Sequence, residues 1–477
     1  MRMTRWQRVI VCAALVLLAP RPTGAEESRS PNVVLVVVDT LRADRLGSYG
    51  NRRGLTPFLD DLAKRSHVFT RAYAQAPWTN PSVASLFTSR YQSQHGITEF
   101  QSVLAADEQT LAEALRDAGY ATGGFSANGL LSRRAGFDQG FDAYRAFLQL
   151  GGAADRLMRP AKRAAEITAE GLRWLDEVRA SRGAVPVFLY LHYMEPHTPY
   201  APPPALLERV RGARAPLDIE ALNRAVILAN LTPPSPEALR DMQDAYDAEV
   251  MAIDEGLRAL AAALDARGML ETSLLVVTAD HGEEFEEHGG MGHGRTLYDE
   301  VLRVPLVIRT PGQTRGVAVE RLVSSVDVAP TVLEVAGVPP RATFEGVSLA
   351  RDLTARRTGS ALRRWFARLL DDRPAPIVLS ERRPQQAAEV RGPTHEDAVV
   401  SGWGKVIRSS DGSRAFYALD VDPGERRPDR VDEGEREHLS ARLQTMRERA
   451  ERNRTRAETH ALDERTRGML RALGYAD

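Results

Sequence analysis

The chain has 477 residues, of which 43% are hydrophobic and 27% are charged, and its formal net charge is -1. This balance is typical of a globular protein, and the length suffices for one large domain and a smaller one. The 63 basic and 64 acidic side chains nearly cancel, and no basic stripe stands out. The composition therefore argues against nucleic acid as a partner.

Residues 1–25 have the layout of a signal peptide. Arg2, Arg5 and Arg8 precede the apolar run VIVCAALVLLA, and small residues follow it. The alternative is a membrane anchor, but the run is shorter than the roughly 20 residues that a span needs. We therefore expect a secreted or periplasmic protein with no stable membrane span after signal removal. Cys12 lies in this segment and is the only cysteine, so the mature chain has no disulfide and no cysteine nucleophile.

The spacing of apolar residues predicts that buried strands and amphipathic helices alternate along about the next 300 residues. The predicted strands cover 32–39, 121–127, the start of 185–200, 272–284 and 304–312. The predicted helices cover 56–66, 110–120, 242–268 and 323–338. This order predicts an α/β fold with a large, mostly parallel sheet covered by helices.

The pattern of predicted helices and strands changes after about residue 350. The segment 355–373 reads as a basic helix, 377–420 as short strands with a hairpin at 406–421, and 433–457 and 462–475 as helices. We expect a catalytic domain over 31–350 and a small C-terminal α+β subdomain over 351–477.

Polar side chains gather where the predicted buried strands end. Asp39, His192, His197, Asp280 and His281 all lie at or just past such ends. In open α/β sheets, ligands bind outside the carboxyl ends of the strands. This edge of the sheet is therefore the predicted functional site.

Asp39, Thr79, Asp280 and His281 could share one divalent metal ion. Carboxylates with an imidazole favour Mn²⁺ or Zn²⁺, while Ca²⁺ or Mg²⁺ is possible. Thr79 precedes a helix that Pro81 is predicted to open, so its hydroxyl is either a helix N-cap or a nucleophile. A metal ion lowers the pKa of a bound hydroxyl, and a helix N-terminus favours an anion.

Two further histidines follow predicted strands, His197 in MEPHTPY and His293 in GGMGHGRTLYDE. They could bind substrate oxygens, protonate a leaving group or hold a second metal. Each could equally be an ordinary surface residue.

Seven stretches carry a pattern shared with a known family: PNVVLVVVDTLRADRLGSYG (31–50), WTNPSVASLFTSRYQSQHGI (78–97), FLYLHYMEPHTPY (188–200), YDAEVMAIDEGL (246–257), LLVVTADHGEEFEEHG (274–289), RTLYDEVLRVPLVI (295–308) and SSVDVAPTVLEVAGVP (324–339). Together they resemble the sulfatase family of the alkaline phosphatase superfamily. The similarity runs from residue 31 to about 350, with a further match at 416–425.

The departures from the family pattern concern its chemistry. Sulfatases oxidise the Cys or Ser of C/S-x-P-x-R to formylglycine, whereas here the frame runs from Thr79 to Val83. A threonine cannot yield that aldehyde, so we expect no formylglycine, and the Arg is missing. The family's sulfate-binding Lys and His are absent near 123–132, and its later substrate Lys is replaced by His293.

These losses make the chain similar to threonine-nucleophile relatives that act on phosphorus esters. The resemblance implies that Asp39, Asp280 and His281 bind the metal and that Thr79 is both ligand and nucleophile. His197 and His293 would hold the ester oxygens or the leaving group, and Asn128 is a candidate substrate contact. The expected partner is a small anionic phosphate or sulfate ester.

The expected activity is therefore hydrolysis through a covalent intermediate on threonine. Three alternatives stay open: a sulfatase that uses the threonine hydroxyl without formylglycine, a phospho-group transferase, and an inactive protein that binds an anionic glycan.

Overall fold

The structure is a computed structural model. It describes residues 30–147, 163–229, 232–354, 376–383, 395–428, 430–452, 454–455 and 457–459. Three predicted segments lie outside the described residues: the signal peptide at 1–25, the basic helix at 355–373 and the last helix at 462–475.

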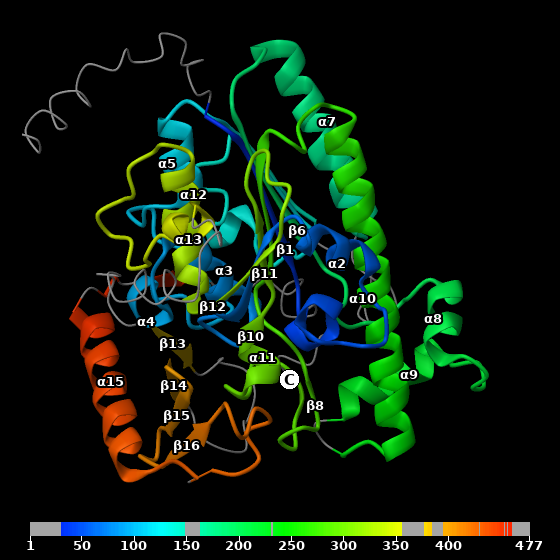
Figure 1. Cartoon of the computed structure of the whole chain (residues 1–477), viewed down its shortest axis with the longest axis vertical. Coiled ribbons are helices and arrows are strands. Elements are labelled where there is room, and N and C mark those ends of the chain that lie inside the picture. The colour runs from blue at the N-terminus through cyan, green and yellow to red at the C-terminus, as the bar shows by residue number, and fades with distance from the viewer. Residues whose placement is uncertain are drawn as a thin grey trace, which may run out of the picture. The chain divides into compact units, whose positions relative to one another are not determined.

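A nine-stranded sheet forms the centre of the described chain (Figure 1). Its order is β10-β2-β11-β7-β1-β6-β4-β5, with β12 also paired to β2. Strands β7, β1, β6, β4 and β5 run parallel, whereas β10 and β11 are antiparallel to their neighbours. The strands are β1 Asn32–Val38, β2 His67–Tyr73, β4 Ala121–Ser126, β5 Ala143–Ala146, β6 Val187–Tyr193, β7 Ser273–Ala279, β10 Arg303–Val304, β11 Leu306–Arg309 and β12 Val317–Ser324.

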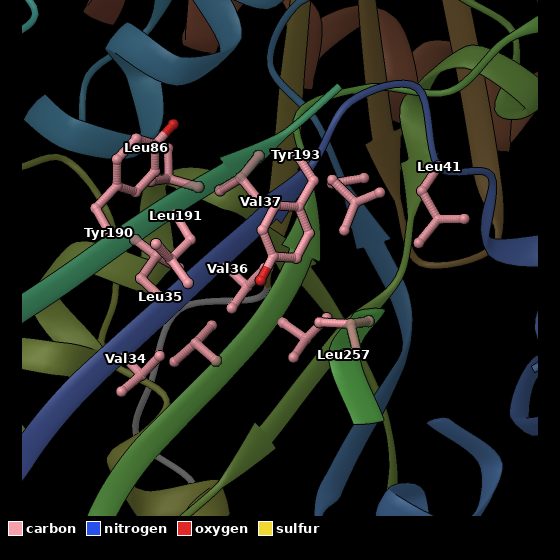
Figure 2. Close-up of a cluster of buried hydrophobic side chains, with 14 of the residues drawn as sticks. Val34, Leu35, Val36, Val37, Leu41, Leu86, Tyr190, Leu191, Tyr193 and Leu257 are labelled. Carbon is pink, nitrogen blue, oxygen red and sulfur yellow. The ribbon is translucent and has the colours of Figure 1, made fainter. Parts of the chain in front are cut away.

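The apolar sequence of β1 follows from its place between two layers of helices. Val33 to Val38 have no exposed surface, because β6 and β7 flank the strand and side chains from both layers cover its faces. Figure 2 shows part of this packing, with labelled side chains of β1 next to Tyr190, Leu191 and Tyr193 of β6. The predicted buried parallel strand is confirmed.

Helices cover both faces of the sheet. In Figure 1, α7 and α10 lie on one side of the strands and α3, α5 and α12 on the other. Within the described ranges, no helix has both the length and the apolar character that crossing a bilayer requires. The helices are α2 Pro57–Ala63, α3 Thr79–Thr88, α4 Gln92–His95, α5 Leu111–Asp117, α7 Ala164–Arg182, α8 Pro204–Arg211, α9 Ile219–Leu228, α10 Pro236–Asp265, α11 Asp299–Leu302, α12 Val328–Val335 and α13 Ala350–Thr354.

Two of the differences between predicted and observed boundaries have a clear physical reason. The helix predicted over 242–268 begins at Pro236, because the Ser235 hydroxyl accepts a hydrogen bond from the Ala238 N–H and caps it. The strand predicted over 304–312 is two short strands that meet at Pro305, which has no N–H to donate to a neighbour.

A second, antiparallel sheet and one long helix form the C-terminal part. The sheet order is β13-β14-β15-β16, and α15 packs Leu439 and Leu443 against Val399 and Val406. The predicted short strands, the hairpin and the helix are confirmed, although the helix ends at Arg452. The elements are β13 Ile377–Arg382, β14 Glu396–Ser401, β15 Gly404–Ser409, β16 Arg414–Ala418 and α15 Glu433–Arg452, and two small ladders pair β3 Ser102–Val103 with β17 Glu458–Thr459 and β8 Glu284–Phe285 with β9 Met291–Gly292.

A tyrosine on α10 holds the turn that follows β1. The buried Tyr246 hydroxyl accepts a hydrogen bond from the Arg42 N–H (3.0 Å) and donates one to the Thr40 carbonyl (2.7 Å). Thr40 itself has a left-handed backbone, with φ of 56°. Because Asp39 immediately precedes this turn, Tyr246 ties the carboxyl end of β1 to α10.

We predict that Tyr246→Phe lowers the free energy of unfolding by about 1–3 kcal/mol, because it leaves a buried N–H and a buried carbonyl unpaired. Urea denaturation of the purified protein measures this change. Tyr298→Phe, at a half-buried tyrosine, is the control and is expected to cost less. Equal stability of Tyr246→Phe and wild type would contradict the proposed role of this hydroxyl.

Candidate functional site

Asp39 and Asp280 lie side by side at the carboxyl ends of two adjacent parallel strands. β1 and β7 pair in register up to Val38 and Ala279, so the next residue of each strand is an aspartate at the same edge. The His281 Nε2 atom is 3.6 Å from Asp39 Oδ1 and 3.6 Å from Asp280 Oδ2. One donor atom from each of the three residues lies within 4.8 Å of the others. The structure thus brings three of the predicted ligands together.

The chemistry of this cluster fits a divalent cation. All three side chains are buried, and among the described residues Asp39 Oδ1 and Asp280 Oδ2 have no hydrogen-bond partner. Burial and the adjacent Asp280 raise the pKa of Asp39 to about 7. Burial also acts to raise the pKa of Asp280, but His281 and His192 hold it below its ordinary value. Paired carboxylates and an imidazole are a donor set suited to Mn²⁺ or Zn²⁺.

Thr79 is the first residue of α3 and faces this cluster. Its Oγ1 is 3.5 Å from Asp39 Oδ2 and 3.4 Å from His281 Nε2. The N-cap position belongs to Trp78, so the interpretation of Thr79 as a cap is wrong. Pro81 is the third helical residue and does not open the helix; a helix tolerates proline throughout its first turn, where N–H groups have no intrahelical partner.

Asn128 follows β4 and lies against the same cluster. Its Nδ2 donates to Asp39 Oδ2 at 2.9 Å and lies 3.4 Å from Thr79 Oγ1, while its Oδ1 accepts from the Leu130 N–H. The amide therefore orients Asp39 and Thr79 relative to each other. Direct contact between Asn128 and a substrate stays a prediction.

His197 and His293 lie close to the cluster and to each other. Their ring centroids are 4.9 Å apart, and the His293 ring is 4.5 Å from that of His281. His293 Nδ1 is 3.0 Å from Glu283 Oε1, and His197 Nδ1 contacts the Thr198 carbonyl. Burial lowers the pKa of both histidines, which favours neutral imidazoles at neutral pH. The structure thus unites all seven predicted site residues.

A short loop after β7 carries His293, and a second Glu/His group holds it. His288 Nδ1 is 2.6 Å from Glu300 Oε1, and the His288 ring stacks on Tyr298 with centroids 3.5 Å apart. Glu284 accepts hydrogen bonds from the backbone of His288 and Gly290. These groups satisfy one another, so His288 has a structural role in this loop.

Two residues of the site were not assigned a role from the sequence. Glu283 is buried beside His293, and His192 is buried with Nε2 3.5 Å from Asp280 Oδ2. His192 stood out only as one of several strand-end polar residues. The sequence offered one indication for Glu283, which is its position two residues after His281 in a stretch predicted to be buried.

Comparison with known proteins places this arrangement in a family. Residues 31–338 match the sulfatase family model. The chain is 25% identical over 423 residues to N-acetylglucosamine-6-O-sulfatase from Bacteroides thetaiotaomicron, covering 71% of this chain and 73% of that protein. It is 27% identical over 385 residues to human arylsulfatase A, covering 70% of each chain.

Solved structures agree on the fold. One, holding its substrate D-glucosamine-2-N,6-O-disulfate, superposes with a TM-score of 0.71 at 20% identity, over 89% of this chain and 99% of that one. The phosphonate monoester hydrolase of Agrobacterium radiobacter gives 0.69 at 21% identity, over 88% and 96%. At these identities the likeness supports the α/β fold with its small C-terminal sheet. Since the family model matches well over half of its length, the chain belongs to the sulfatase family.

Proposed function

We propose that this protein is a metal-dependent hydrolase of anionic esters in which Thr79 is the nucleophile, with phosphate monoesters or diesters as the first candidate substrates. The observation that carries the proposal is the position of the Thr79 hydroxyl. It lies within 3.5 Å of both Asp39 and His281 in a buried, doubly acidic cluster, where an N-cap would instead point back to its helix.

The surroundings of Thr79 favour an anionic, tetrahedral ester. The first N–H groups of the ten-residue helix α3 have no intrahelical partner and attract negative charge. A divalent cation held by Asp39, Asp280 and His281 would lower the pKa of a bound hydroxyl and withdraw charge from the ester. His197 and His293 stand on the same side and are placed to contact the ester or leaving-group oxygens.

The proposed reaction has two balanced steps. Thr79 Oγ1 bonds to phosphorus or sulfur as the bond to the leaving oxygen breaks; Thr79 loses one proton and the departing alcohol gains one. Water then attacks the ester on Thr79, restoring the hydroxyl and releasing the acid. His293 is the proposed donor to the leaving oxygen through Nε2–H. Burial raises the pKa of Glu283 to about 7, so a protonated Glu283 can donate to Nδ1, keep the imidazole proton on Nε2 and replace it once it is given up.

The names of the relatives point to sulfate and phosphonate esters as substrates but do not identify the substrate of this protein. Several of them are sulfatases, and one structural neighbour is a phosphonate monoester hydrolase. Threonine at position 79 favours phosphorus, because the formylglycine route of the family is closed to it. We also propose export from the cytoplasm, on the signal-peptide layout of residues 1–25.

A sulfate ester hydrolase that uses the same threonine is the second candidate, favoured by the names of the sequence relatives. A transferase would use the same first step and pass the group to an alcohol. An inactive glycan-binding protein is disfavoured, because an anion-binding site needs no pair of buried carboxylates beside a hydroxyl.

We predict that Thr79→Ala lowers turnover of phosphorus esters by about 10³-fold or more, because it removes the attacking oxygen. Thr79→Ser keeps a hydroxyl and is expected to retain far more activity than Thr79→Ala. Aryl phosphate monoesters and diesters, a phosphonate and a sulfate, each assayed with purified protein, measure this effect. Mass spectrometry of acid-quenched wild type is expected to find the transferred group on Thr79.

The other possible outcomes of these assays would each indicate a different function. Undiminished turnover by Thr79→Ala contradicts the nucleophile. Sulfate turnover above that of every phosphorus ester supports the second candidate. A product formed with an added alcohol in preference to water indicates a transferase. Absence of turnover together with absence of bound metal indicates a binding protein.

We predict that Mn²⁺ or Zn²⁺ raises the melting temperature of chelator-treated protein, since a ligand at 100 times its Kd stabilises the folded state by about 2.7 kcal/mol. Asp280→Asn is expected to abolish the rise. The matched control is Glu300→Gln, which alters the second Glu/His group and is expected to preserve the rise. Loss of the rise in Glu300→Gln but not in Asp280→Asn would place the metal elsewhere.

We predict that His293→Gln lowers kcat/KM for an alkyl phosphoester by about 10²–10⁴-fold, because an alkoxide needs a proton to leave. The loss for a 4-nitrophenyl ester is expected to be smaller, since nitrophenolate leaves without one. The control is His438→Gln, at an exposed histidine on α15. Equal losses for both leaving groups would assign His293 to substrate binding only.

A further inference from the structure

His192 is a buried imidazole near the end of β6, an otherwise apolar and aromatic strand. It lies between Val37 of β1 and Ser126 of β4 and has no exposed surface. Among the described residues, neither of its ring nitrogens makes a hydrogen bond of regular geometry, and Nε2 makes a long contact of 3.5 Å with Asp280 Oδ2. An unsatisfied buried polar group costs about 1–3 kcal/mol, and an apolar side chain would avoid that cost in a sheet of this kind. The imidazole at this position therefore calls for a functional explanation.

The carboxyl groups nearest to His192 are those of the acidic pair. Its Nε2 is 3.5 Å from Asp280 Oδ2 and 4.0 Å from Asp39 Oδ2. Asp280 Oδ1 is already engaged, because it accepts hydrogen bonds from the Thr40 N–H (3.3 Å) and the His281 N–H (2.9 Å). Asp280 Oδ2 has no hydrogen-bond partner among the described residues. This oxygen thus lies between two imidazole nitrogens, that of His192 and that of His281 at 3.6 Å.

The two imidazoles differ in their relation to the cluster. His281, Asp39 and Asp280 each offer one atom within 4.8 Å of the others, and His192 is not part of that group. His192 therefore contacts Asp280 without belonging to the set of atoms that could share one ion. Its main chain serves a separate purpose, because the His192 carbonyl accepts a hydrogen bond from the Ala127 N–H at 2.9 Å, next to Asn128. A side-chain substitution leaves that backbone bond intact.

We propose that His192 is a positioning residue of the metal site, which donates its Nε2–H to Asp280 Oδ2 and so orients that oxygen toward the cation. An sp² carboxylate oxygen has two lone pairs and can accept this bond while it serves as a ligand. Groups of this kind set the orientation of metal ligands, and their loss typically weakens metal binding by about 10–100-fold. The inference deepens the proposed function and rests on its metal site.

Two substitutions distinguish the packing of the His192 ring from its proposed hydrogen bond to Asp280 Oδ2. His192→Leu removes the donor while filling apolar space, and His192→Gln returns an amide N–H near the position of Nε2. Competition with a fluorescent chelator measures the Kd of Mn²⁺ and Zn²⁺ for each purified full-length protein. We expect His192→Leu to weaken binding by about 10–100-fold. We expect His192→Gln to recover most of that loss.

Thermal unfolding of the metal-free proteins is the folding control. His192→Leu is expected to melt close to the temperature of wild type, because loss of the bond to Asp280 Oδ2 is offset by removal of the unpaired Nδ1 atom. Should it fail to fold, His192→Asn takes its place, since its shorter amide does not reach Asp280 Oδ2 and is expected to bind metal as weakly. A purely structural role for His192 would reverse this pattern, with stability lost and metal affinity kept.

Three results would overturn the proposal. One is a His192→Leu protein that binds metal as tightly as wild type. Another is X-ray absorption that finds one more imidazole ligand in the wild-type complex than in the His192→Leu complex, which would make His192 a direct ligand; we expect the same number in both. The third is failure of wild type to bind metal at all, which overturns the metal site itself and is distinguished by the wild-type titration.

Discussion

The site depends on one electrostatic constraint: two carboxyl groups are buried next to each other, away from solvent. The register of β1 and β7 puts Asp39 and Asp280 at the same edge, and burial together with their mutual repulsion opposes a second negative charge. Either a proton on Asp39 or a cation between them relieves this repulsion. The neighbouring N–H donors from Asn128, Thr40 and His281 hold the two groups in place.

The same constraint bears on the proposed nucleophile, because the Thr79 hydroxyl is buried beside the two carboxyl groups, where a bound cation would lower its pKa. A free hydroxyl at neutral pH holds its proton, and an N-capping hydroxyl is occupied by its helix. Thr79 is neither, because Trp78 takes the cap position and Oγ1 faces Asp39 and His281. Its β-methyl group closes the aldehyde chemistry of the family but leaves direct attack by the oxygen available.

Much of the fold was predictable from the sequence, because burial on both faces leaves a continuous apolar run in strands such as Asn32–Val38. The edge that carries the site was predictable for the same reason, since polar residues mark where those runs end. The Glu283–His293 contact was not, because a loop sets that distance and no periodic pattern reports it. The cap at Thr79 was misread because a Thr-x-Pro start also fits a residue one position inside the helix.

The C-terminal sheet contacts the loop that carries His293. Lys405 on β15 is fully buried and contacts Asp299 at 3.0 Å and Glu425 at 2.8 Å. Glu425 also accepts the Asp299 N–H and, through its carbonyl, contacts His288. A buried lysine between two carboxylates is costly to break, because either partner would be left as an unpaired charge. The loop that carries His293 is therefore fixed at both ends, by β7 and by the second sheet, which gives this small C-terminal unit a part in aligning the proposed proton donor.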